Sequence, residues 1–408
     1  MTSDRFPVHR PAAKVIFGRE FIDRGHTVDW LLRADESATE SGSLETESGT
    51  MYVAPTDSGA SRLSRLRKRL YDFRNDLQML SLVRRNHYDI IQVKDKYVAG
   101  LIALIASWLG KTALCYWIAY PQTEADIEAA RRGTARYRWL YWIRGQALRT
   151  LLYKLLLAKS DHVFVQSEQM KRDFSGQGVP LERMTAVPGS LDLAEVPFDG
   201  THHSEKLDLG AGGSIVYLGT LIRLRRLSIL ISALQEVRKT HPDARLFLLG
   251  RGEDPEDEAE LRAEATRLGL ARAVVFVGHL PMIDAYEYIR AANVCVSPYY
   301  PTPILNSTSP TKLIEYMAMG KPVVGNSHPE QSFLIEQTGA GLCVEWDAIE
   351  FGEAITRILD EPEAWLEKAS EGRAFVKRER TNKVMASIVE TGYAKAIESF
   401  RRSQNAHP

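Results

Sequence analysis

The segment Asn306–Gly325, which reads NSTSPTKLIEYMAMGKPVVG, holds the residues best suited to chemistry. Ser309 and Pro310 are residue types that start a helix, as N-cap and first helical residue, and Gly320 is typical of a helix end. The unpaired N–H groups at a helix start bind anions. Glu315 lies about 8 Å further along the axis, roughly the span from a nucleotide's diphosphate to its ribose diol. One helix could therefore hold both groups, although a capped helix with an exposed glutamate is the simpler alternative.

Predicted strands upstream of this helix end in glycine. The glycines are Gly219, Gly250 and Gly278, after strands expected at 214–218, 244–249 and 274–277. Glycine lets a ligand approach the backbone, and open α/β sheets bind ligands at the carboxyl ends of their strands. Arg223, Arg225 and Arg226 follow Gly219, and guanidinium groups chelate phosphate oxygens. A solvated basic loop is the alternative for these arginines.

Length and composition limit the function classes. The chain has 408 residues, which predicts two domains of about 180 residues each. Lys plus Arg and Asp plus Glu both total 52, so the overall charge gives no indication of nucleic-acid binding. Its 3 cysteines are widely spaced, which suits a reducing compartment and predicts neither disulfides nor a zinc site. With no signal peptide and no apolar run long enough to span a bilayer, we expect a cytoplasmic protein.

The amino-terminal part predicts a parallel α/β domain with an irregular start. Strand, helix and strand at 89–93, 97–109 and 112–118 form a βαβ unit. Such a domain should open with an apolar strand, yet only Met1–Asp4 precede a loop and the first helix. We expect this first strand to be missing, leaving an apolar gap beside the strand at 27–32, with a stub as the alternative. Residues 35–60 read as a surface loop, and Ser61–Arg85 as a long helix with an apolar stripe.

A strongly basic run follows the βαβ unit. Residues 124–160 are expected to be helical, and no acidic residue lies between Glu128 and Asp161. The basic residues are Arg131, Arg132, Arg136, Arg138, Arg144, Arg149, Lys154 and Lys159. Aromatic residues such as Trp139 and Trp142 are interleaved with them, a pattern typical of a helix lying on an anionic membrane surface. A core helix with inward aromatics and solvated arginines explains the pattern equally well.

Several motifs together resemble glycosyltransferase family 4, the retaining nucleotide-sugar transferases of GT-B fold. They are Tyr217-Leu-Gly-Thr, Leu249-Gly-Arg-Gly-Glu, Phe276-Val-Gly, Pro310 to Val324, Val165-Gln-Ser-Glu and Val187-Pro-Gly. The resemblance implies an α/β protein of two Rossmann-like parallel-sheet domains facing across a cleft. Residues 1–190 would form the acceptor-side domain and 191–380 the nucleotide-sugar domain, with a final helix in 381–408 crossing back to the first.

The resemblance also implies residue roles. Glu315 matches the family's ribose-binding glutamate, Arg225 its diphosphate-binding lysine, and we expect this pair to be catalytic. Ser307 replaces the first glutamate of the family's pair. Thr220 replaces a phosphate-binding arginine, for which Arg223 would substitute. The expected donor site is Gly219, Thr220, Arg223, Arg225, Gly250, Arg251, Gly278, Ser307, Ser309, Pro310, Thr311, Lys312, Leu313 and Glu315. No metal and no cofactor are expected beyond the donor itself.

The resulting prediction is a retaining glycosyltransferase that moves a sugar from a nucleotide diphosphate to a carbohydrate or lipid-linked acceptor. Arginines and a helix start would stabilise the leaving diphosphate. A nucleotide-sugar-binding protein that has lost catalysis is one alternative, supported by Ser307 and the missing strand. A nucleotide-sugar hydrolase or epimerase of the same fold is another. Product analysis separates the three.

Overall fold

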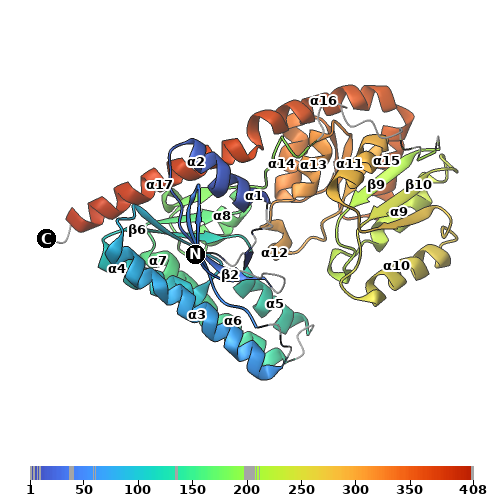
Figure 1. Ribbon diagram of the computed structural model, residues 1–408. Helices are drawn as coiled ribbons and strands as arrows, with labels where there is room; N and C mark the ends of the chain where they lie inside the picture. Colours follow the sequence, from blue (N-terminus) through green and yellow to red (C-terminus); the bar gives the residue numbers. More distant parts are fainter. Residues whose placement is uncertain are drawn as a thin grey trace. The chain divides into compact units, whose positions relative to one another are not determined.

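The chain folds into two compact units, one made of residues 1–188 and 382–408 and the other of residues 189–381 (Figure 1). The computed structural model describes residues 2, 5, 6, 8, 11–35, 41–57, 59, 61–133, 137–196, 207, 209, 210 and 212–405. The second unit is continuous in sequence, whereas the first is closed by the last helix of the chain.

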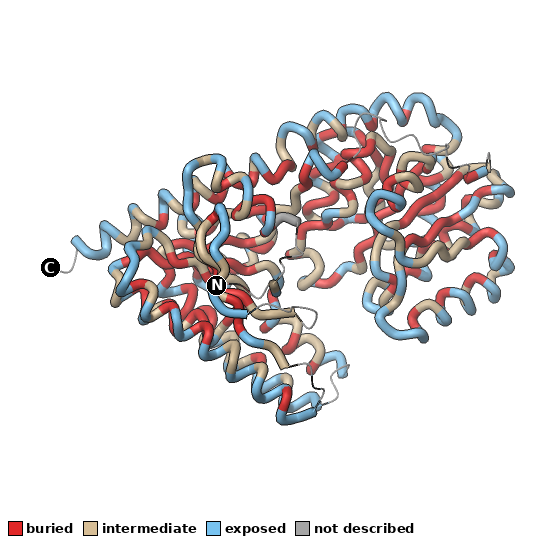
Figure 2. Tube along the Cα trace, viewed as in Figure 1, coloured by how far each residue is buried: buried red, intermediate tan, exposed pale blue. Residues whose placement is uncertain are grey.

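The second unit is a parallel sheet covered by helices on both faces. Its strands run in the order β11-β10-β9-β12-β13-β14. They are β9 (Ser214–Leu218), β10 (Arg245–Leu249), β11 (Val274–Gly278), β12 (Val294–Ser297), β13 (Val323–Asn326) and β14 (Gly341–Val344). Figure 2 shows much of this sheet in the colour of buried residues, as expected for short apolar strands covered on both faces.

Two apolar cores lie on opposite faces of this sheet. One contains side chains of α9 (Ser228–Val237), α10 (Pro255–Arg267) and α15 (Ala348–Asp360). The other contains side chains of α11 (Met282–Ala291), α13 (Thr311–Ala318), α14 (Pro329–Thr338) and α16 (Pro362–Glu379). The strand order reverses between β9 and β12, and at such a switch point the strand ends diverge and leave room for a ligand.

The first unit contains two smaller sheets. One is parallel, in the order β5-β6-β7-β8: β5 (Ile90–Lys94), β6 (Ala113–Ile118), β7 (His162–Val165) and β8 (Met184–Ala186). The other runs β1-β2-β4-β3: β1 (Arg5–Phe6), β2 (Trp30–Ala34), β4 (Gly49–Val53) and β3 (Gly42–Thr46). The prediction of a surface loop at 35–60 was therefore wrong in part, since β3 and β4 form an antiparallel hairpin and β4 also pairs with β2.

The first strand is a stub rather than missing. β1 has two residues, and they pair in parallel with Arg33 and Ala34 at the end of β2. Leu31 enters one core of the unit while Trp30 and Leu32 enter the other, so β2 lies in the same layer as β5–β8. No strand ladder of the described residues joins β2 or β1 to β5, however. A cavity of about 570 Å³ is lined by residues of β2 and β5.

The lining of that cavity differs from the apolar gap that we expected. Trp30 and Ile90 contribute apolar surface, but Asp29, Gln92 and Lys94 line it as well. A gap beside β2 is therefore present, but its lining is partly polar and not apolar as expected.

Helices cover both faces of the sheet layer in the first unit. One core takes side chains from α3 (Arg62–Arg85), α4 (Tyr97–Gly110), α8 (Glu168–Ser175) and the π-helical turn Leu152–Leu156. The opposite core takes them from the segment Ile16–Asp23 and from α17 (Asn382–Asn405). Tyr393 of α17 donates a hydrogen bond to Gln92 of β5 at 2.8 Å, which ties the end of the chain to this sheet.

The basic run is not one helix. It is divided among α5 (Gln122–Arg132), α6 (Arg138–Leu151), the π-helical turn and α7 (Leu157–Lys159), and α5 packs against α6. Arg136 lies outside the described residues. Tyr153 is buried, as a core helix requires, while Trp139 is 68% exposed, and contact with a membrane stays a prediction. No helix within the described ranges is long and apolar enough to cross a bilayer.

Candidate functional site

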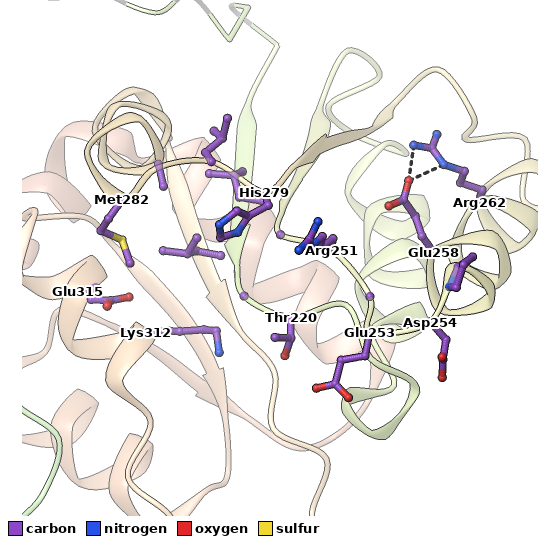
Figure 3. A pocket seen from close by; sticks show the side chains of 18 of the residues that line it. Thr220, Arg251, Glu253, Asp254, Glu258, Arg262, His279, Met282, Lys312 and Glu315 are labelled. Carbon is purple, nitrogen blue, oxygen red and sulfur yellow. Dashed lines mark hydrogen bonds and ion pairs between the residues drawn. The ribbon is translucent and has the colours of Figure 1, made fainter. Parts of the chain in front are cut away.

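A cavity of about 1140 Å³ lies at the carboxyl ends of β9, β10 and β11 (Figure 3). The segment Gly250–Pro255 after β10 forms one wall, and His279 and Leu280 after β11 form another. Thr311, Lys312 and Glu315 of α13 border it together with Gly219 and Thr220 after β9. The predicted strand ends and the predicted helix therefore meet around one space.

Two glycines make the floor of this cavity possible. Gly219 has φ of 151°, and a Cβ placed on it would lie 2.0 Å from Cε of Lys312. Gly250 has φ of 137°, and its Cβ would lie 1.9 Å from the carbonyl oxygen of Gly219. A side chain at either position would strain the backbone and collide with a neighbour. Gly278 ends β11, and its carbonyl accepts a hydrogen bond from the Gly250 N–H at 2.8 Å.

Lys312 contributes a cationic group to the lining of the cavity. Its side chain extends from α13 toward Thr220 (Figure 3), and its Nζ lies 6.0 Å from the ring centroid of Tyr217. Burial, helped by the nearby Arg225 guanidinium, lowers the pKa of this ammonium to about 7. The Glu315 carboxylate acts in the opposite direction. An anion in the cavity would restore the charge of this ammonium.

Glu315 lies one turn beyond Lys312 on α13 and also borders the cavity. Burial raises the pKa of its carboxyl group, and the Lys312 ammonium opposes this rise. A half-buried carboxylate of this kind is well suited to accept hydrogen bonds from a diol.

The start of α13 differs from the prediction in one respect. The helix begins at Thr311 with Pro310 as N-cap, and no side chain caps it. Ser309 is not the N-cap: it is buried, and its Oγ accepts a hydrogen bond from the Gly189 N–H at 2.9 Å. The Ser309 hydroxyl, which the sequence predicts to cap the helix, is thus engaged with a residue distant in sequence. The helix start has no side-chain cap and can still bind an anion.

Four other members of the predicted donor site are not among the residues that line the cavity: Gly278, Ser307, Pro310 and Leu313. Leu313 is fully buried in the apolar core under α13. Ser307 is buried at the end of α12 (Pro303–Asn306), and its Oγ donates a hydrogen bond to the Pro303 carbonyl at 3.2 Å.

The arginines after β9 have different environments. Arg225 ends a short 3-10 turn and is not among the residues that line the cavity, but its Nε donates a hydrogen bond to Oγ1 of Thr220, which does line it, at 3.1 Å. Arg223 instead forms ion pairs with Glu256 at 2.8 Å and Glu260 at 2.9 Å. Its guanidinium therefore points toward α10, so the structure does not support Arg223 as a second phosphate-binding arginine.

One wall of the cavity was not anticipated from the sequence. It contains Glu253, Asp254 and Glu258, and an ion pair of 2.6 Å joins Glu258 to Arg262 (Figure 3). The acidic run directly after Gly252 could have indicated this wall in the sequence, since loops that follow glycine-ended strands line such sites. Met282 also lines the cavity, and no feature of its sequence context indicated this.

The site offers cationic and backbone groups rather than metal ligands. Within the part of the chain that the structure describes, no group of three or more His, Cys, Asp or Glu side chains is placed to hold a metal ion. Lys312, Arg225 and the start of α13 supply positive charge and N–H donors around one end of the cavity. This arrangement can bind a polyanion such as a diphosphate.

Sequence comparison gives two matches that follow one another along the chain. The profile of the glycosyl transferases group 1 matches residues 212–361, and that of the glycosyl transferase 4-like domain matches residues 17–189. The D-inositol 3-phosphate glycosyltransferase of Acidothermus cellulolyticus is 30% identical over 195 residues. That match covers 45% of this chain and 42% of the relative, so it spans less than half of the relative's length.

Solved structures agree over nearly the whole chain. The sucrose-phosphate synthase of Thermosynechococcus elongatus superposes with a TM-score of 0.67 at 19% identity, covering 97% of this chain and 96% of that one. HepE of Anabaena, solved in complex with UDP, gives a TM-score of 0.67 at 19% identity and covers 96% and 98%. With the two matched profiles, the shared fold shows that this chain belongs to the group 1 glycosyltransferases, glycosyltransferase family 4, and has the GT-B fold.

Proposed function

We propose that the protein transfers a sugar, with retention of anomeric configuration, from a nucleotide-diphosphate sugar to a carbohydrate acceptor. The observation that carries this proposal is the meeting of Lys312, Glu315 and the uncapped start of α13 in one cavity floored by Gly219 and Gly250. The solved structure of HepE, a relative by fold, contains UDP.

The donor would lie along α13. Its diphosphate would contact the N–H groups at the helix start, Lys312 and Arg225, which provide charge and hydrogen-bond donors at one end of the cavity. Its ribose would reach Glu315, one turn further on. The wall formed by Arg251 and its neighbours after β10 would then face the nucleobase.

The chemistry follows from this placement. As the bond from the anomeric carbon to the diphosphate breaks, negative charge grows on the leaving oxygen. Lys312, Arg225 and the helix start are fixed before the reaction, so they stabilise that charge without reorganising. The acceptor hydroxyl attacks from the face that the diphosphate leaves and passes its proton to a diphosphate oxygen. No protein carboxylate has to act as nucleophile.

The proposed acceptor is a lipid-linked sugar or a polysaccharide at the cytoplasmic face of a membrane. Trp139, Trp142 and Ile143 of α6 are exposed and would enter the interface. Several basic groups of the run are engaged within the protein, however. Arg144 pairs with Asp126 at 2.7 Å, and Arg132 pairs with Glu128. The electrostatic part of this contact is therefore weaker than the sequence suggests.

A catalytically inactive nucleotide-sugar-binding protein is the second candidate, favoured by the buried Ser307 and the two-residue β1. A thermal-shift screen of nucleotide sugars identifies the donor, because a ligand at 100 times its Kd adds roughly 2.7 kcal/mol of stability. The donor found is then incubated with and without acceptor sugars. Transfer product with a retained anomer supports the proposal, binding without turnover supports the second candidate, and free or isomerised sugar indicates a hydrolase or epimerase.

A further inference from the structure

Helix α3 is oriented with most of its apolar stripe outward, while Leu80 at the end of the stripe packs against the core. Leu63, Leu66, Leu70, Phe73 and Leu77 are between 37% and 69% exposed. The side chains that turn inward are partly polar, as shown by the buried Ser64, Asn75 and Asp76. An amphipathic helix normally buries its stripe, so this orientation indicates that the stripe contacts something outside the unit.

The inward polar residues fix that orientation. The Asn75 amide donates hydrogen bonds to the carbonyls of Leu32 and Tyr52, each at 3.1 Å. The Asp76 carboxylate forms a buried ion pair with Lys96. Rotating the helix to bury its leucines would break both sets of contacts, and buried polar groups without partners are unfavourable. The exposed stripe is therefore a stable feature of the unit.

The exposed surface of α3 is positively charged. Its exposed arginines are Arg62, Arg65, Arg67, Arg69, Arg74, Arg84 and Arg85. The acidic residues of the helix are both engaged toward the protein, Asp72 with Arg33 at 3.0 Å and Asp76 with Lys96. The surface that α3 presents thus combines large apolar side chains with arginines and no exposed carboxylate of its own.

Helix α4 carries further exposed apolar side chains on the first unit. It packs against α3, and both helices contribute to the same core. Val98, Ile105 and Trp108 of α4 remain exposed, Trp108 at 77%. The helix contains no charged residue. Exposed tryptophan and leucine beside arginines are typical of a surface that enters a membrane interface.

A second copy of the chain is the competing occupant, because the stripe repeats at the alternating spacing of three and four residues seen in helix pairs. In such a pair the residues flanking the stripe face one another. Here the flanks carry Arg67 and Arg74 on one side and Arg69 on the other. Pairing two copies would therefore bring like charges together, whereas an anionic partner would neutralise them.

We propose that α3, extended by Trp108 of α4, is the principal contact of this protein with an anionic lipid bilayer. The inference rests on the membrane contact of the proposed function, but assigns it to a helix outside Arg131–Lys159. The apolar side chains would insert between headgroups while the arginines bind lipid phosphates.

The test is co-sedimentation of the full chain with vesicles of phosphatidylcholine, alone or mixed with phosphatidylglycerol. Three variants are compared: R65Q/R69Q/R74Q, L66S/L70S/F73S, and W139S/W142S on α6 as the matched control. We expect the unmodified chain to bind only the anionic vesicles. The R65Q/R69Q/R74Q variant should bind them roughly 100-fold less well at low salt. The second should lose binding as well, and the control should keep most of it.

Two results would overturn the proposal: no binding by the parent, or loss of binding in the α6 variant with both α3 variants unaffected. If the unmodified chain is a dimer in solution and the L66S/L70S/F73S variant is a monomer, the stripe binds a second copy of the chain instead of a membrane. Circular dichroism should show equal melting of all variants, since the changed side chains are exposed. Sugar transfer to a water-soluble acceptor should be unchanged in the α3 variants, so failure of the membrane contact and failure of the proposed chemistry are distinguishable.

Discussion

The Lys312 side chain passes over Gly219 so closely that a Cβ on the glycine would lie 2.0 Å from Cε of the lysine. The end of β9 and the first turn of α13 are thereby fitted to each other, and the ammonium is held at the edge of the cavity. The glycine motif and the lysine, more than 90 positions apart in sequence, act as one structural unit.

Gly219→Ala should therefore displace Lys312 and strain the backbone. We expect the free energy of unfolding to fall by about 1–3 kcal/mol, because φ at this position is 151°. Donor affinity should fall as well, since the ammonium loses its place. Denaturant unfolding and calorimetric donor binding measure the two effects. Gly18→Ala is the control, because a Cβ there meets nothing within 4 Å, and it should leave donor binding unchanged.

Donor binding should be coupled to proton uptake at Lys312. Burial lowers the pKa of this ammonium to about 7, so above that pH it is largely neutral in the empty site. A diphosphate favours the charged form and raises the pKa, so the complex takes up a proton and affinity rises as the pH falls toward 7. Titration calorimetry in buffers of different ionisation enthalpy measures this uptake. Lys312→Met should abolish it, and uptake that persists in this variant would assign the proton to another group.

Glu315→Ala should weaken donor binding more than it slows the reaction. The ribose diol is the same in the substrate and in the transition state, so its contacts contribute uniform binding. We expect a loss of roughly 1.5–3 kcal/mol in donor affinity, the range for hydrogen bonds to a charged group. Steady-state kinetics with varied donor measures both constants. A collapse of the maximal rate at unchanged donor affinity would contradict this role.

Arg225→Ala should act mainly on the maximal rate. Charge grows on the diphosphate as the glycosidic bond breaks, and the guanidinium is hydrogen-bonded to Thr220, which lines the cavity. A decrease of about 100-fold is expected, by comparison with loss of one oxyanion donor. Arg223→Ala is the matched control, because Arg223 pairs with Glu256 and Glu260 and should leave the rate nearly unchanged. Equal losses in both variants would show that Arg223 also serves the donor.

The folded state should lose stability in mild acid because of His328. This side chain is buried, its Nε2–H donates to the Leu305 carbonyl at 2.8 Å, and its Nδ1 accepts from the Glu330 N–H. Burial lowers its pKa from 6.5 to about 4, so between these values the unfolded chain binds the proton more readily. The free energy of unfolding should fall as the pH drops from about 6.5 to about 4, by up to about 3 kcal/mol. His328→Asn should flatten that part of the stability curve.

The alternation of strands and helices was predictable because its physical cause is local. Ser214–Leu218 has the predicted bounds, and Arg245–Leu249 and Val274–Gly278 each differ from the predicted bounds by one residue. Strands buried on both faces are short apolar runs, and amphipathic helices repeat every three to four residues. The hairpin at 42–53 was missed, because its serine, glycine and glutamate content is that of a loop.

Other features depend on contacts that no local pattern contains. The stripe on α3 is visible in the sequence, but its outward orientation follows from the contacts of Asn75 and Asp76 with distant segments. Ser309 has the chemistry of an N-cap and instead accepts a hydrogen bond from Gly189. Arg223 was placed near the diphosphate by its position after β9, whereas acidic residues of α10 determine where it points.

The discontinuous first unit has a consequence for synthesis of the protein. Met385, Val389 and Ala396 of α17 are fully buried in the core that also holds Phe17 and Trp30. Residues 189–381 form a compact unit without interruption, so they can fold while the chain is still emerging from the ribosome. The amino-terminal segments leave the ribosome first, but the core that they share with α17 is complete only when the last helix has been made. A nascent chain stopped before Asn382 would therefore leave part of this core open to water.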